Sequence, residues 1–257
     1  MSVRVAREGA VAVVTIDRQD ALNALDVATL SELRDRLREL GGDAGVRALV
    51  LTGAGDRAFV AGADIKYMSG LSPEQAKDWG TLGHEAGTLL ETMPKATIAA
   101  LNGFALGGGC ELALACDIRF ASTRARLGQP EISLGIIPGW GGTQRLARAT
   151  TLGFAKELIF TGRLVDADEA LSRGLVDAVV EPEELLPKAL ETARLIASKS
   201  PVALAAAKEA CNRALQGDHA ANLAAEADRF AVLFSSEDAK EGMTAFVEKR
   251  EPRFTGR

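Results

Sequence analysis

The chain has 257 residues with 47% hydrophobic content, enough for one large domain with a substantial core. Its formal net charge of -5 disfavours nucleic-acid binding as the main activity, because no overall basic surface is available to neutralise phosphates. No apolar stretch approaches the roughly 20 residues that cross a bilayer, and three cysteines support neither a disulfide framework nor a metal cage. We therefore expect a cytoplasmic protein without a leader, a membrane segment or a metal.

Along its first half the chain alternates apolar, strand-like runs with helical periodicity, which is typical of an α/β fold. Strands are predicted at 11–16 and 48–52, and the leucine repeat between them predicts a helix that Asp26 caps. Two further strands are predicted at 97–101 and 117–121, on either side of a glycine-rich turn and a short apolar helix. This order predicts strands joined by helical crossovers in an α/β core.

Beyond about residue 151 the pattern is mostly helical. Helices are predicted at 167–173, 185–198, 201–215 and 218–234. We divide the chain into a core, residues 1–200, which carries the substrate and catalytic site, and a helical C-terminal region, residues 201–257. The sequence shows no internal repeat and no low-complexity linker, so this boundary is a change of architecture within one folded body.

A first candidate site segment, 102–117, reads NGFALGGGCELALACD. Three glycines before a helix let backbone N–H groups approach a ligand, and the helix dipole there stabilises an oxygen that becomes negative during a reaction. Glu111 lies in the first turn of this helix. A plainer alternative is that Glu111 only complements the helix dipole and that the glycines only permit a tight turn.

Two more segments carry candidate residues. The segment 58–68, AFVAGADIKYM, can supply a second N–H, or it is an ordinary surface turn in which Asp64 caps a helix and Lys66 is solvated. The segment 128–142, GQPEISLGIIPGWGG, places Glu131 among apolar residues. Desolvation there raises the proton affinity of a carboxyl group, as a general acid or base near neutral pH requires, or Glu131 only binds a backbone amide.

Other kinds of site lack their residues. Neither a GxGxxG dinucleotide motif nor a phosphate-binding P-loop occurs. His84 and His219 are the only histidines, and both are interpreted as structural or solvated, so a His-rich metal site or a nucleophile with a histidine base is not supported. Cys110 adjoins the glycine turn and is interpreted as a small packing residue.

Taken together, these segments resemble the enoyl-CoA hydratase (crotonase) family over nearly the whole chain. The TGRLVDADEALSRGLVDAVV stretch from Thr161 and the EGMTAFVEKR stretch from Glu241 resemble further landmarks of that family. The resemblance implies an α/β fold of the crotonase type, a spiral of repeated ββα units with a helical C-terminal trimerisation region. It also implies a homotrimer, or a homohexamer built from two stacked trimers.

For the site, the resemblance implies that the backbone N–H groups of Ala63 and Gly108 form an oxyanion hole for the thioester carbonyl of an acyl-CoA substrate. Glu111 and Glu131 match the two catalytic carboxylates, Glu131 supplying a proton to Cα and Glu111 activating water. The N–H of Gly139 resembles the group that steadies this arrangement. Because related isomerases, hydrolases and dehalogenases usually alter one or both glutamates, we expect an enoyl-CoA hydratase that adds water syn to a trans-2-enoyl-CoA, giving 3-hydroxyacyl-CoA.

The resemblance also implies CoA contacts, and no separate cofactor is expected because CoA is part of the substrate. The matching positions are Ala21, Leu22, Ala61, Asp64, Ile65 and Lys66, with Phe246 and Lys249 matching positions that reach adenine and phosphate in the same or a neighbouring subunit. Two residues depart from the family pattern. Asp20 replaces a residue that is often basic, which puts one phosphate contact in doubt. Trp140 replaces a residue that is often smaller, so the size of the acyl pocket does not follow from the family.

Alternative functions remain open at this point. The same scaffold supports enoyl-CoA isomerisation, or hydration of a branched or carboxylated acyl chain, because a fold fixes the site but not the substrate. A non-catalytic or RNA-binding role is the third possibility, and the chain offers no basic aromatic stripe for it.

Overall fold

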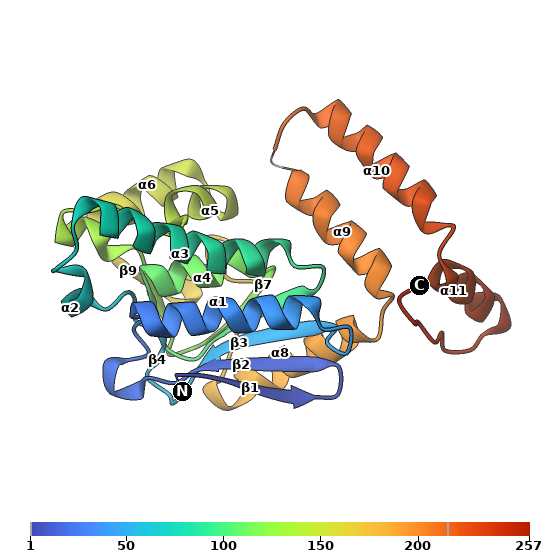
Figure 1. Ribbon diagram of the computed structural model, residues 1–257, viewed down its shortest axis with the longest axis horizontal. Coiled ribbons are helices and arrows are strands. Elements are labelled where there is room, and N and C mark those ends of the chain that lie inside the picture. The colour runs from blue at the N-terminus through green and yellow to red at the C-terminus, as the bar shows by residue number, and fades with distance from the viewer. Residues whose placement is uncertain (1, 215) are drawn as a thin grey trace.

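Two β-sheets form the centre of the molecule in the computed structural model, which describes residues 2–214 and 216–257 (Figure 1). The strands are β1 (Val3–Glu8), β2 (Val11–Ile16), β3 (Ala48–Gly53), β4 (Ala58–Val60), β5 (Ala96–Leu101), β6 (Phe104–Leu106), β7 (Ile118–Ser122), β8 (Arg126–Gly128), β9 (Leu164–Asp166) and β10 (Ala178–Val180). The larger sheet has the order β1-β2-β3-β5-β7-β10, and the smaller has β4-β6-β8-β9. Among the described residues, β1 and β9, at one edge of each sheet, are the strands that pair antiparallel to their neighbours.

Helices cover both faces of the larger sheet. They are α1 (Val27–Gly42), α2 (Ile65–Met68), α3 (Pro73–Thr92), α4 (Gly108–Ala115), α5 (Gly142–Ala149), α6 (Leu152–Thr161), α7 (Ala167–Ser172), α8 (Pro182–Ala197), α9 (Pro201–Arg213), α10 (His219–Leu233) and α11 (Glu237–Glu248), with 3₁₀ turns η1 (Gln19–Ala21) and η2 (Pro130–Leu134). One face of the sheet packs in a core with α1, α3 and α4, and the other packs against α8. Burial on both faces explains the continuous apolar runs of β2 and β3.

The chain repeats a ββα unit. Strands β3, β5 and β7 lie in the larger sheet, and the strand that follows each of them, β4, β6 or β8, lies in the smaller sheet. A helix or helical turn follows each pair, so that α3 comes after β4, α4 after β6 and η2 after β8. Topology therefore repeats where the sequence does not, because each unit needs only two short apolar strands and a helix.

The predicted long elements are confirmed. Leu30, Leu33, Leu37 and Leu40 are buried on one face of α1, and the Asp26 carboxylate accepts the N–H of Thr29 at 2.8 Å as the helix cap. The strands predicted at 11–16, 48–52, 97–101 and 117–121 correspond to β2, β3, β5 and β7 within one residue at each end. The helix predicted at 201–215 is found as α9, and its expected last residue, Leu215, lies outside the described residues.

The C-terminal helices α9 to α11 extend away from the sheets (Figure 1). Lys208 of α9 ties this region to the core, since its Nζ donates to the carbonyl oxygens of Leu90 and Lys95 at 2.8 and 2.9 Å and pairs with Asp117 at 2.8 Å. The division at residue 200 coincides with the start of α9, and its status as a domain boundary stays a prediction. No helix within residues 2–214 or 216–257 is long and apolar enough to span a membrane.

Candidate active site

A cavity of about 690 Å³ opens between α2, α3, the start of α4 and the segment that follows β8. It brings together residues from all three segments that the sequence singled out. Ala63, Gly108, Glu111, Glu131 and Gly139 all line it. Its size and largely apolar lining suit a small-molecule site with a few polar groups.

The loop between β4 and α2 is fixed by backbone bonds to the segment before α1. The Ala61 N–H donates to the carbonyl of Leu22 at 3.1 Å, and the Leu25 N–H donates to that of Gly62 at 2.9 Å. This pairing leaves the N–H of Ala63 without a partner among the described residues. The N–H of Gly108, in the first turn of α4, is likewise unpaired there, because a first helical turn has no internal acceptors. Two N–H donors from different elements are thus available at one cavity.

Each of the three glycines at the start of α4 is required for a different reason. Gly107 has a φ of +50°, which side chains rarely adopt. A Cβ on Gly108 would lie 2.2 Å from the Trp140 ring, and one on Gly109 would lie 2.0 Å from the carbonyl oxygen of Val60. The glycines therefore do more than permit a turn, because they let α4 pack closely against β4 and against the indole of Trp140.

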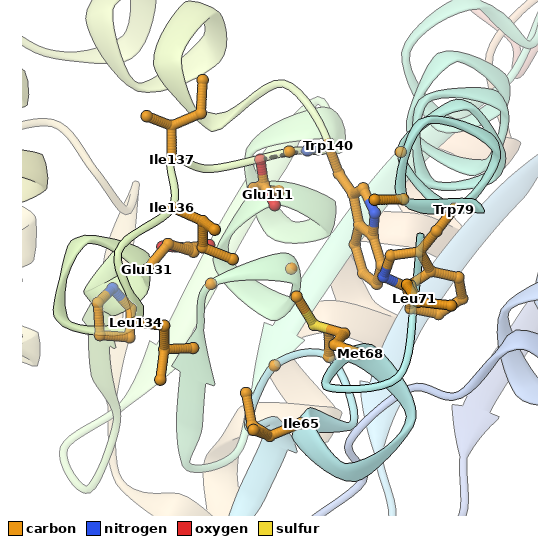
Figure 2. Close-up of a pocket in the computed structure, with 18 of the residues that line it drawn as sticks. Ile65, Met68, Leu71, Trp79, Glu111, Glu131, Leu134, Ile136, Ile137 and Trp140 are labelled. Atoms are coloured by element: carbon orange, nitrogen blue, oxygen red, sulfur yellow. Dashed lines mark hydrogen bonds between the residues drawn. The ribbon is translucent and has the colours of Figure 1, made fainter. Parts of the chain in front are cut away.

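Glu111 is a buried carboxylate, 2% exposed, on the first turn of α4. Its Oε1 accepts the backbone N–H groups of Trp140 and Gly142, each at 2.7 Å, and Figure 2 shows the first of these bonds. Burial raises the pKa of Glu111, while these N–H groups and the Arg145 guanidinium oppose that shift. Oε1 is fixed in place, and Oε2 has no hydrogen bond within the part of the chain that the structure describes. Glu111 therefore does not serve only the helix dipole.

Glu131 lies in η2, directly after β8, and faces the same cavity (Figure 2). Burial raises the pKa of Glu131 to about 7, and the charge of Glu111 adds to this shift. Of the two interpretations of this carboxyl group, desolvation is the one that these surroundings support. The fully buried amide of Gln129 adjoins it and, in the orientation that satisfies both groups, donates to Oε1 and Oε2 at 3.1 and 3.2 Å.

Arg145 of α5 holds the loop that carries Trp140. Its Nη1 donates to the Trp140 carbonyl at 2.8 Å, and its Nη2 and Nε bind Glu91 of α3 at 2.8 and 3.1 Å. Sequence reasoning missed this residue and the Trp140 and Gly142 N–H groups. A usable signal was present, since an arginine directly after a glycine-rich loop has several donors with which to fix that loop.

An aromatic wall closes one side of the cavity. Trp140 and Trp79 are 3% and 6% exposed, and their rings meet edge to face with centroids 5.0 Å apart. The Tyr67 ring in turn contacts Trp79 edge to face, with ring centroids 5.2 Å apart. In Figure 2, Met68 and Leu71 lie on the same side as the two indoles, and Glu131 lies opposite. Sequence reasoning did not identify Trp79, which sits in the middle of α3.

The expected CoA contacts fall into two groups, and the first surrounds the cavity. Ala61 and Ile65 line it, and Ala21 and Leu22 lie beside it through the Leu22–Ala61 bond. Asp20 lies next to them in η1.

Asp64 and Lys66 show the features of a plain capped turn. The Asp64 carboxylate accepts the N–H groups of Lys66 and Tyr67 at 3.1 and 3.4 Å and pairs with Arg18 at 3.5 Å, and Lys66 is exposed. The Asp64 oxygens are thus occupied within the protein. A CoA role for either residue stays a prediction.

Phe246 and Lys249 form the second group and are not brought to the cavity within one chain. Phe246 belongs to α11 and is 85% exposed, and Lys249 caps that helix. In Figure 1, α11 and α2 lie at opposite ends of the molecule. Any contact of these residues with CoA therefore requires a neighbouring subunit.

The described residues offer no site for metal binding or for catalysis by a cysteine thiolate. No group of three His, Cys, Asp or Glu side chains there is placed to hold a metal ion. Burial raises the pKa of the Cys110 thiol to about 12, which makes a thiolate unavailable near neutral pH and confirms its interpretation as a packing residue. His84 and His219 are exposed, as expected for solvated side chains.

Comparisons with known proteins agree on one family. The sequence model of the Enoyl-CoA hydratase/isomerase family matches residues 6–257. A short-chain-enoyl-CoA hydratase of Clostridium acetobutylicum is 53% identical over 244 residues, 95% of this chain and 94% of that protein. A crotonyl-CoA hydratase of Syntrophomonas wolfei is 49% identical over 248 residues, 96% of this chain and 95% of that protein. The crystal structure of an enoyl-CoA hydratase from Bacillus anthracis matches with a TM-score of 0.97 at 42% identity, covering 100% of both chains. This structural match confirms the predicted fold class.

Proposed function

This chain belongs to the enoyl-CoA hydratase/isomerase family, and from that premise we propose that Glu111 and Glu131 hydrate a 2-enoyl-CoA thioester in the cavity. The chain is an enoyl-CoA hydratase, a hydro-lyase that converts a trans-2-enoyl-CoA and water into a 3-hydroxyacyl-CoA. The observation that carries the proposed mechanism is the meeting of two desolvated carboxyl groups and two unpaired backbone N–H groups in one cavity.

The N–H groups of Ala63 and Gly108 bind the thioester carbonyl oxygen. Because that carbonyl is conjugated with the double bond, its polarisation makes Cβ electrophilic, and attack by water moves negative charge onto the oxygen as an enolate. Fixed N–H donors in a site shielded from water stabilise such a charge without reorganisation during the reaction. The positive end of the α4 dipole lies at Gly108 and adds to this stabilisation.

The environments of the two carboxyl groups support different roles for them. Burial raises the pKa of Glu111, but the two backbone N–H groups that its Oε1 accepts and the charge of Arg145 oppose this rise, which supports Glu111 as the base that deprotonates water. Burial and the charge of Glu111 raise the pKa of Glu131 to about 7, so that its protonated form is present near neutral pH, which suits the acid that protonates Cα. Since both groups border one cavity, the proton and the hydroxyl group reach the same face of the double bond. Their titrations are coupled, so apparent pKa values belong to the pair.

Stability should depend on pH through Glu131. The folded-state pKa of about 7 lies above the ordinary value of 4.5, so the folded protein binds more protons than the unfolded chain between these values. The contribution of Glu131 to the free energy of unfolding therefore falls as pH rises through this window. Glu131→Gln is expected to raise the melting temperature relative to wild type at about pH 8, and to do so less at about pH 5. Differential scanning fluorimetry measures the melting temperatures, and Glu183→Gln, at an exposed position, is the control. If Glu131→Gln changes the melting temperature equally at both pH values, the raised pKa of Glu131 is contradicted.

A product assay tests the activity. With crotonyl-CoA we expect loss of the absorbance of the conjugated enoyl thioester and formation of 3-hydroxybutyryl-CoA, identified by mass spectrometry. An enzyme that instead only converts a 3-enoyl-CoA into the conjugated 2-enoyl-CoA is an isomerase. That outcome would keep the family and the site and reject the hydratase.

Cofactor, partner and location are parts of the same proposal. The substrate is an acyl-CoA, no separate cofactor takes part, and the protein works in the cytoplasm, where its free cysteine thiols stay reduced. We also propose a homotrimer or a homohexamer, supported by exposed apolar side chains on and beside α10 and α11. These are Phe230, Val232, Phe234, Phe246 and Val247. Light scattering should give three or six times the chain mass of 27.0 kDa, and a single-chain mass would contradict the proposal.

A further inference from the structure

The Trp140 side chain forms part of the cavity wall, on the side of Glu111 (Figure 2). Its ring lies against Gly108 on one side, where a Cβ would come within 2.2 Å of it, and against Gly83 of α3 on another, where a Cβ would come within 2.1 Å. Trp79 contacts it edge to face, with centroids 5.0 Å apart. Two positions without side chains and one aromatic partner thus accommodate a large ring in the inner wall.

The backbone of Trp140 is fixed at the catalytic centre. Its N–H donates to Glu111 at 2.7 Å, and its carbonyl accepts Arg145 Nη1 at 2.8 Å. With the main chain held at both ends and the indole 3% exposed, the ring cannot swing aside without displacing α3 or α4. The wall is therefore rigid, in contrast to the opposite rim, where Ile137 is 66% exposed.

We propose that Trp140, in edge-to-face contact with Trp79, is a specificity-determining residue that ends the acyl part of the cavity and restricts the enzyme to short 2-enoyl chains. This inference rests on the proposed function, because it needs the thioester carbonyl at Ala63 and Gly108 and the double bond between the two glutamates. An acyl chain that continues from Cβ then runs along the indoles. Each further methylene must displace a packed ring or leave the cavity toward solvent.

The test compares crotonyl-CoA with 2-decenoyl-CoA in wild type, Trp140→Phe and Trp140→Ala. Because one methylene in an apolar pocket changes kcat/KM by about 10-fold or more, the ratio of kcat/KM for decenoyl-CoA to that for crotonyl-CoA should rise at least about 10-fold in Trp140→Ala. Trp140→Phe should give a smaller rise. Leu146→Ala is the matched control, since Leu146 is fully buried in α5 but outside the cavity, and it should lower stability without changing the ratio.

A second measurement keeps the inference testable if Trp140→Ala folds poorly. Gly108→Ala places a methyl group 2.2 Å from Cζ3 of the indole, an atom that phenylalanine lacks, so it should lower the melting temperature in the wild-type background and much less in the Trp140→Phe background. If the melting temperature falls equally in both backgrounds, the indole does not occupy the position that the inference requires. An unchanged chain-length ratio in both Trp140 variants would overturn the specificity role. Wild type inert toward crotonyl-CoA would instead reject the proposed function itself.

Discussion

Glu131→Gln is expected to lower kcat for the hydration of crotonyl-CoA by about 10²- to 10⁴-fold, the range that general acid–base catalysis supplies. The amide keeps the shape of the carboxyl group and cannot give a proton to Cα. Glu111→Gln should produce a loss of similar size, because Oε1 can still accept the Trp140 and Gly142 N–H groups while the base is gone. Steady-state kinetics by absorbance at the enoyl thioester band measures both.

Two controls separate chemistry from folding in these variants. Circular dichroism and melting temperature should show a folded protein, and the KM for crotonyl-CoA should change much less than kcat, because the N–H groups that bind the carbonyl remain. The double variant should lose less than the product of the single losses, since both groups act as a unit in one addition reaction. Retention of wild-type kcat by either variant would remove that glutamate from the mechanism.

Gly109→Ala should have the second large effect. Its Cβ would lie 2.0 Å from the carbonyl oxygen of Val60, a backbone atom at the end of β4, so α4 must move away from the loop that carries Ala63. The N–H groups of Ala63 and Gly108 would then no longer converge on one oxygen. Removing one such donor costs about 10²- to 10³-fold in kcat, and we expect a loss of that size. The crowding should also lower the free energy of unfolding by about 1–3 kcal/mol.

Gly153→Ala in α6 is the matched control for Gly109→Ala. No atom lies within 4 Å of the position of its Cβ, so activity should stay at the wild-type level. Chemical denaturation and crotonyl-CoA kinetics on both variants give the comparison. If a folded Gly109→Ala protein keeps the wild-type kcat, the close packing of α4 against β4 does not determine the geometry of the oxyanion hole.

Local patterns predicted most of the long elements, although they gave no bounds for the 20-residue helix α3, and they missed the short elements for a physical reason. The four leucines of α1 and the continuous apolar runs of β2 and β3 carry a clear periodicity. The strands of the smaller sheet each have three residues, too few to show alternation, and they form because the neighbouring strand of the larger sheet places them. The exposed edge strand β1 was missed as well, since only Val3 of its six residues is buried.

Some residues of the candidate site could likewise be predicted from the sequence, and others could not. The first-turn position of Glu111 and the apolar surroundings of Glu131 were visible in the sequence, and both residues line the cavity. The groups that hold Glu111 were not visible, because Trp140 and Gly142 lie 29 and 31 residues further along the chain. Likewise, Trp79 meets Trp140 because the loop before α5 places the Trp140 ring against α3, at Gly83. Contacts between distant segments carry no local periodicity, and only the fold reveals them.

Hydration of crotonyl-CoA in deuterium oxide tests the central claim most directly, because it reports the product and the geometry of both proton transfers at once. Nuclear magnetic resonance of the product should show one deuterium at Cα and the hydroxyl group at Cβ added to the same face of the double bond. That result is required if Glu111 delivers the water and Glu131 the proton from one side of the substrate. Addition to opposite faces, or no 3-hydroxybutyryl-CoA at all, would contradict the two-carboxylate mechanism.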